Sequence, residues 1–146
     1  MLLSAQKSTQ VTFFLQAHSI GADLMVSITA GQAHIGAVAL ATPRPSLSQP
    51  QTTSADAHVL TLSGHKEDLL ARAAALKLCA AMGVPVCLSC GIHISHFQPQ
   101  HESIITETVL GFVDDLLALL RHSTAQEHYT CTRSITLPIQ EHHSYD

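Results

Sequence analysis

The alternation of apolar and polar residues in the first third of the chain is the feature that most limits how it can fold. Two segments, residues 11–18 and 22–31, place an apolar side chain at every second position. Successive side chains of a β-strand point to opposite faces, so this period predicts strands with one buried face. Residues 19–21 predict a short turn that makes the pair antiparallel. Residues 34–41 are almost wholly apolar, as in a central strand that is buried on both faces.

A helical period replaces the strand period after a short fourth strand, which we expect at residues 58–62. The segment 63–83 predicts a helix that begins at Ser63 as N-cap and stops at Gly83. The apolar stripe expected to face the core consists of Leu69, Ala73, Leu76 and Ala80.

A fifth strand and a second helix complete the expected elements. The strand is expected at residues 84–93, and Pro99 suits the first turn of the helix. The expected stripe of this helix consists of Ile105, Val109, Phe112, Leu116 and Leu119.

The order of four strands, a helix, a strand and a helix predicts an α+β fold. We expect a single two-layer domain over residues 1–122, in which two helices cover one face of a mainly antiparallel sheet of about five strands. Residues 123–146 are expected to form a polar tail with at most one short strand, near residues 134–139.

The composition limits the class of partner. Charged residues make up only 12% of the 146 residues, hydrophobic residues make up 46%, and the formal net charge is -4. Without a basic field, neither nucleic acid nor an anionic membrane is an expected partner. A sparsely charged surface favours burial against other chains, so we expect a homo-oligomer or a partner complex. No signal peptide or membrane span is recognisable, and a cytoplasmic location is expected.

Cys87 and Cys90 have the spacing of a metal or redox motif, but their position on a strand argues against both. Residues three apart on a strand point to opposite faces, so the two thiols cannot bind one zinc ion. We interpret both cysteines as small buried hydrophobes, and Cys79 and Cys131 likewise.

Histidine is the unusual residue, with 11 copies against 7 for lysine and arginine together. His34, His65 and His93 fall where strands or a helix begin or end, and such positions gather in binding sites. Each can be a structural histidine, or all three can meet in one pocket. In the second case they could be the neutral ligands of a metal ion.

The expected start of the first helix also offers groups that suit an anion. Ser63, Gly64, His65 and Lys66 supply free amides, a hydroxyl and a cation, and Arg44 lies between two prolines on a stiff segment. The alternative is that the segment 63–66 and the Arg44 side chain are simply solvated surface. The acidic side chains on the helices are interpreted as solvated faces: Glu67, Asp68, Glu102 and Glu107. No known catalytic motif nominates a nucleophile or a base.

Three motifs, taken together and in order, resemble the LpdD-like family: HIGAVALATPRPSL, SGHKEDLLAR and GIHIS. Members are small proteins regarded as chaperones for prenylated flavin in UbiD-type decarboxylases such as gallate decarboxylase. The resemblance covers roughly residues 10–120. It marks these positions: His34, Gly36, Arg44, Pro45, Ser46, Gly64, His65, Lys66, Asp68, Gly91 and His93. An acidic residue is expected shortly after Gly-Ile-His, but Ser95 and His96 stand there.

The resemblance implies a non-catalytic accessory protein that transiently binds prenylated FMN or FMN and assists maturation of a UbiD-type decarboxylase. The residues then expected at the cofactor are His34, Arg44, Ser46, Ser63, Gly64, His65, Lys66 and His93. Two alternatives stay open. One is a small metal-dependent enzyme that uses His34, His65 and His93, and the other is a non-catalytic interaction module.

Overall fold

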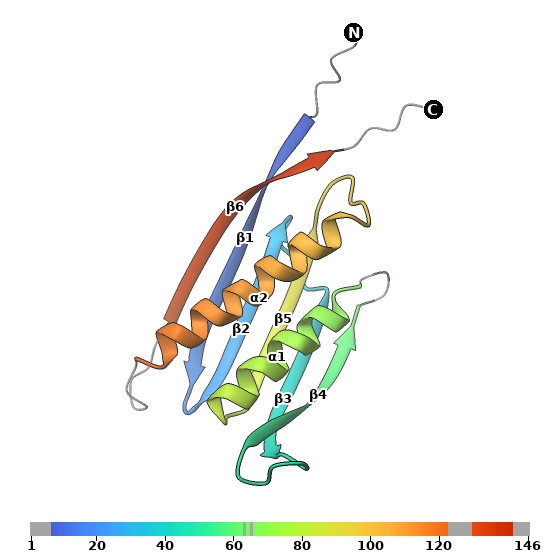
Figure 1. Ribbon diagram of the computed structural model, residues 1–146. Helices are drawn as coiled ribbons and strands as arrows, with labels where there is room; N and C mark the ends of the chain where they lie inside the picture. The colour runs from blue at the N-terminus through green and yellow to red at the C-terminus, as the bar shows by residue number, and fades with distance from the viewer. Residues whose placement is uncertain (1–6, 63, 65, 123–129, 142–146) are drawn as a thin grey trace.

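The chain folds into a six-stranded mixed sheet with two helices across one face (Figure 1). The computed structural model describes residues 7–62, 64, 66–122 and 130–141. The elements, in chain order, are β1 (Lys7–Ile20), β2 (Asp23–Gly31), β3 (Ala37–Pro45), β4 (Thr53–Thr61), α1 (Asp68–Met82), β5 (Val86–His93), α2 (His101–Leu120) and β6 (Thr130–Glu141). The predicted α+β class, with both helices on one face, is confirmed.

The position of β5 in the sheet determines where a site can form. The strand order is β4-β3-β5-β2-β1-β6, so β5 lies between β3 and β2. It runs parallel to β2, with His93 opposite Gly31, and antiparallel to β3, with Cys90 opposite Ala37. The ends of β2 and β5 and the start of β3 therefore meet at one edge of the sheet.

The last strand is longer than the short strand expected near residues 134–139. It pairs with β1 along its whole length, from Thr130 opposite His18 to Glu141 opposite Lys7. Leu137 and Ile139 pack against the core on the helix side, whereas the other side of the strand is polar. This one-sided burial leaves only a weak apolar signal in the sequence.

The buried faces of the strands agree with the period-two pattern. Phe13 and Leu15 of β1 and Val26 and Ile28 of β2 are at most 2% exposed. The sheet face that carries them packs under both helices.

The buried face of α1 differs from the expected stripe. Leu69 is 75% exposed, and the residues that face the sheet are Ala71, Ala74, Ala75, Leu78 and Cys79. Because alanine occurs around much of this helix, its sequence period does not single out one face. In α2 the expected stripe is buried except for Leu119, which is 49% exposed.

The end of α1 is as predicted, but its start is not. Gly83 adopts a left-handed conformation with φ 67° and donates its N–H to the carbonyl of Cys79. The helix begins at Asp68 with Glu67 as N-cap, so the expected start at Ser63 is wrong. Neither described helix is long and apolar enough to cross a membrane.

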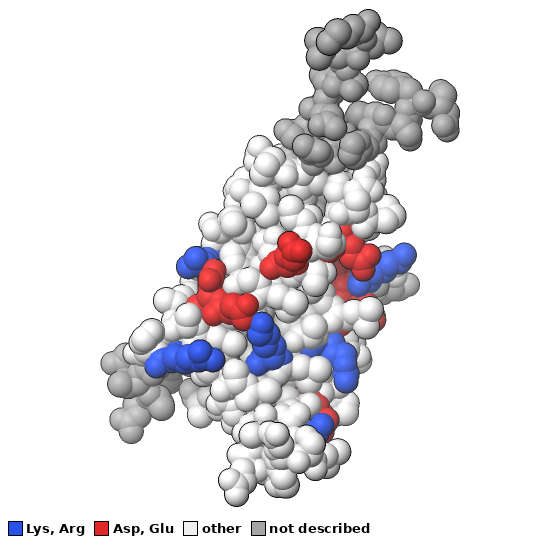
Figure 2. Space-filling view, viewed as in Figure 1, with Lys and Arg blue, Asp and Glu red and all other residues white. Residues whose placement is uncertain are grey.

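Charged side chains are spread over the helix side of the molecule (Figure 2). Lys77 of α1 and Asp114 of α2 are 2.6 Å apart, and Arg133 of β6 lies 2.9 Å from Asp115. Such exposed pairs contribute little to stability, about 0–1 kcal/mol each. Three of these four side chains lie on the helices: Lys77, Asp114 and Asp115.

Candidate functional site at the ends of β2 and β5

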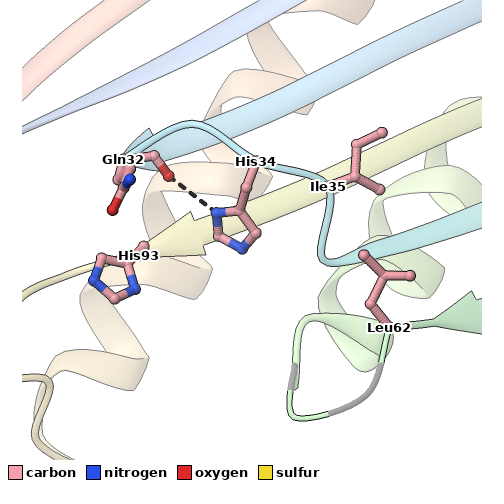
Figure 3. Close-up of a pocket in the computed structure, with 5 residues that line it drawn as sticks. All are labelled: Gln32, His34, Ile35, Leu62 and His93. Carbon is pink, nitrogen blue, oxygen red and sulfur yellow. Dashed lines mark hydrogen bonds between the residues drawn. The ribbon is translucent and has the colours of Figure 1, made fainter.

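The segment between β2 and β3 brings His34 next to His93 at the end of β5. The centroids of the two imidazole rings are 6.4 Å apart, and the rings meet edge to face at 81°. With three neighbours they line a pocket of about 560 Å³ (Figure 3). Its lining residues are Gln32, His34, Ile35, Leu62 and His93. Of the three histidines that could meet in one pocket, His34 and His93 therefore lie next to each other.

Glycines allow this segment to lie directly against β5. A Cβ atom on Gly91 would lie 1.8 Å from the carbonyl oxygen of His34. Gly31, where the segment leaves β2, has φ 67°, which favours glycine, and a Cβ there would lie 1.8 Å from the carbonyl oxygen of His93. Side chains at either position would push His34 away from His93.

A carboxylate from the start of α1 completes the site. The side chain of Glu67 is only 10% exposed, and its Oε1 lies 3.3 Å from Nε2 of His34. The same oxygen accepts a hydrogen bond of 3.0 Å from the backbone N–H of Ile92. The last pair between β3 and β5 joins Ala37, the first residue of β3, and Cys90. Glu67 therefore binds β5 just beyond the point where its pairing with β3 ends.

Hydrogen bonds hold the His34 ring from two sides. Nδ1 lies 2.9 Å from the carbonyl oxygen of Gln32, and Nε2 faces Glu67. Both ring nitrogens therefore face oxygen acceptors, and the ring orientation is determined by the backbone of the segment and by the carboxylate. A Cβ on Gly36 would lie 2.5 Å from Oε2 of Glu67, so this glycine makes room for the carboxylate.

The interpretation of Glu67 as part of a solvated helix face is wrong. That interpretation depended on a helix that begins at Ser63, which would have placed Glu67 on the second turn. With the start at Asp68, Glu67 is the N-cap residue and points back to the strand ends. Glu102 and Glu107 of α2 are exposed, as expected.

Residues 7–121 match the prenylated flavin chaperone LpdD-like domain. The chain belongs to this family. The match extends from β1 past the end of α2 and includes all the residues of the pocket. It also confirms the resemblance that the three motifs indicate. No curated protein matches the chain.

Two of the residues expected at the cofactor of this LpdD-like domain lie away from the pocket. Arg44 is seven positions along β3 from Ala37, which corresponds to about 23 Å. Its Nε donates to Asp56 at 2.9 Å and its Nη1 to the carbonyl of Pro45 at 3.1 Å. Ser46 follows β3 and accepts a hydrogen bond from the N–H of Gln49. The strand β3 continues to Pro45 and carries both residues away from His34.

The remaining expected residues lie on the segment that leads into α1. Gly64 is exposed with φ 81°, and Lys66 is exposed next to Glu67. Ser63 and His65 are outside the described residues. Because α1 begins at Asp68, Gly64 and Lys66 precede the helix rather than form its first turn. Their binding of a phosphate stays a prediction.

Metal binding by three histidines is likewise untested. Within residues 7–62, 64, 66–122 and 130–141, no three histidine, cysteine or acidic side chains are grouped closely enough to hold a metal ion. His34 and His93 are adjacent, but His65 lies outside these ranges.

The two cysteines of β5 point to opposite faces, as predicted. Cys90 is fully buried beneath the helices, whereas Cys87 is partly exposed on the other face. Burial raises the pKa of the Cys90 thiol to about 12, and the negative charge of Glu67 adds to the shift. In the LpdD-like domain this thiol therefore stays neutral and serves packing.

The raised pKa of Cys90 predicts a loss of stability at alkaline pH. In the unfolded chain the thiol ionises near its ordinary pKa of 9.0, whereas the folded thiol keeps its proton up to about pH 12. The unfolded state binds fewer protons in this window, so the free energy of unfolding falls as the pH rises, by about 1.4 kcal/mol per unit. Urea unfolding of wild type and Cys90→Ala across this window measures the difference. Equal slopes for wild type and Cys90→Ala would contradict the prediction.

Proposed function

We propose that this chain binds prenylated FMN in the pocket of His34 and His93 and delivers it to a UbiD-type decarboxylase of the gallate decarboxylase kind. The observation that carries the proposal is the meeting of these two imidazoles beside the apolar side chains of Ile35 and Leu62. Membership in the family indicates the class of ligand, and the pocket supplies a place for it.

The pocket suits a flavin in size and chemistry. Its volume of about 560 Å³ lies within the range of about 300–1,000 Å³ that is typical of small-molecule sites. Ile35 and Leu62 offer apolar contact to the ring system. Within the described parts of the chain the ring nitrogens of His93 have no hydrogen-bond partner, so they can bond to flavin heteroatoms. The nitrogens of His34 face Gln32 and Glu67, so His34 contributes ring packing.

The phosphate of the flavin requires a cation and free donors. Lys66 is exposed and immediately precedes Glu67, whose carboxylate lies 3.3 Å from the His34 ring. We assign the phosphate to Lys66 and the amides around Gly64, together with Ser63 and His65. Arg44 is bonded to Asp56 at the other end of β3 and is not part of this assignment.

The proposed role is that of a carrier rather than an enzyme. Prenylated FMN supplies the decarboxylation chemistry in the partner enzyme, and this chain would bind, orient and shield the flavin before transfer. Such a role requires no nucleophile or general base. We place this activity in the cytoplasm with the decarboxylase.

Reconstitution of a partner enzyme tests the proposal. An apo UbiD-type decarboxylase is mixed with prenylated FMN in the presence or absence of this protein, and recovered decarboxylation is measured. We expect severalfold higher recovery with the protein and co-elution of flavin with it on gel filtration. Unchanged recovery together with the absence of co-eluting flavin would contradict the proposal.

Substitution of His93 separates pocket binding from nonspecific binding. His93→Ala should weaken flavin binding about tenfold, because the loss of one or two hydrogen bonds costs about 1–1.5 kcal/mol. A flavin fluorescence titration measures the change. His18→Ala, an exposed histidine at the far end of β1, is the matched control and should bind flavin as the wild type does. Equal affinities for His93→Ala and His18→Ala would place the flavin elsewhere.

A further inference from the structure

The sheet face opposite the helices, here called the open face, carries no described helix. Strand alternation and register identify its side chains. Leu40, Cys87 and Met25 form a row across β3, β5 and β2, because Leu40 pairs with Cys87 and Met25 with Cys87. Leu60 and Phe14 extend this apolar surface and are 79% and 46% exposed.

The open face is almost without charge. Among the described residues of the six strands, its charged side chains are Asp23, at the start of β2, and Arg44 and Asp56, which bond to each other near one end. The other polar side chains of this face are glutamine, serine, threonine and histidine: Gln10, Thr12, Gln16, His18, Ser27, Thr29, Thr42, Ser54, His58, Ser89, His93, Thr130, Thr132, Ser134 and Thr136. The helix side, by contrast, carries many charged side chains (Figure 2).

We propose that the open face binds the open face of a second copy of this chain. Two identical faces with so little charge repel each other only weakly. A partner that is recognised by its charge is not favoured, because Arg44 and Asp56 neutralise each other and only Asp23 remains, at the rim of the face. The six strands average about ten residues. At about 3.3 Å per residue and about 4.8 Å between strands, they give the open face an area of roughly 1,000 Å². A stable interface buries about 800 Å² per partner, so the open face has about the size that a sheet-on-sheet dimer needs.

The pocket lies on the same face, so the second copy would cover it. Gly91 follows Cys87 and Ser89 on the open face, and the position of its absent Cβ is occupied by the carbonyl of His34. The backbone of His34 therefore lies on the open face. Figure 3 shows the pocket residues in front of the sheet with the helices behind. Ile35 and Leu62 are 57% and 53% exposed. The covering of a flavin pocket by the second copy rests on the proposed function, whereas the proposal of a dimer does not.

Matched leucine substitutions on the two sides of the molecule test the dimer. Leu40 on the open face is 47% exposed, and Leu119 on α2 is 49% exposed. In sedimentation of the flavin-free protein at micromolar concentration, wild type and Leu119→Glu should have twice the chain mass of 15.6 kDa. Leu40→Glu should sediment as a monomer with an unchanged circular dichroism spectrum. A monomeric wild type, or a dimeric Leu40→Glu, would overturn the proposal.

Thiol labelling provides a second test that requires no folding of a variant. Cys87 lies in the centre of the open face and is partly exposed in the single chain. Its reaction with a maleimide should be slow at high protein concentration and at least tenfold faster on dilution below the dimer dissociation constant. A labelling rate independent of protein concentration would contradict the dimer. If Leu40→Glu is monomeric but binds flavin with wild-type affinity, the dimer is supported, but the inference that the second copy covers the pocket is wrong.

Discussion

Replacement of Glu67 with alanine is expected to lower the free energy of unfolding by about 2–4 kcal/mol and to abolish tight flavin binding. The substitution removes the acceptor of the Ile92 N–H and the carboxylate that faces His34. A buried polar group that loses its partner costs about 1–3 kcal/mol, and more where a charged partner is removed. Urea unfolding measures the first effect and flavin fluorescence the second.

Two further variants separate the roles of Glu67. Glu67→Gln keeps an oxygen for the Ile92 N–H but loses the negative charge beside His34, so we expect about half of the stability loss of Glu67→Ala. Glu102→Ala removes an exposed glutamate from α2 and should change stability by less than about 0.5 kcal/mol. If Glu67→Ala is as stable as Glu102→Ala, the carboxylate does not organise the site.

Replacement of Gly91 with alanine is the second change with a large expected effect. The added Cβ would lie 1.8 Å from the His34 carbonyl, which is backbone and cannot move by a side-chain rotation. Residues 32–36 must then shift away from β5, which we expect to cost about 3 kcal/mol or more. Because the shift separates His34 from His93, flavin binding should be lost together with stability.

Gly111 in α2 is the matched control for this substitution. A Cβ on Gly111 would meet no atom within 4 Å, and the residue lies inside a helix, where alanine is favoured over glycine. Gly111→Ala should therefore raise the free energy of unfolding by about 0.5–1 kcal/mol. If Gly91→Ala is no less stable than Gly111→Ala, the close approach of the segment to β5 is not a feature of the fold.

The fold class could be predicted because the periods of single elements are local. The strand pattern around Phe13 and Ile28 and the stripe of α2 arise from residues a few positions apart. The pairing of β6 with β1 joins residues more than a hundred positions apart. Because one side of β6 is polar, its sequence carries only a weak strand pattern. The face of α1 was misplaced because alanine is small enough to face either side.

The site could be predicted only in part, because it depends on contacts between segments that are far apart in the sequence. His34 and His93 were recognised because both flank strands, and strand ends at one sheet edge converge. The role of Glu67 depends on β5 lying beside β3 and on the true start of α1, and neither follows from the local pattern. Arg44 was assigned to the site because two prolines flank it on a stiff segment and because the resemblance marks it. Pairing with β4 makes this segment a strand that leads away from the site.

A site-resolved titration by NMR tests the central claim most directly. Reduced prenylated FMN is added under anaerobic conditions while the imidazole signals are followed, with His34→Ala and His93→Ala used for assignment. We predict that the signals of His34 and His93 shift and saturate at one flavin per chain. The signals of His18 and of His122, after the end of α2, should not move. Flavin binding that leaves His34 and His93 unshifted, or the absence of binding, would contradict the account.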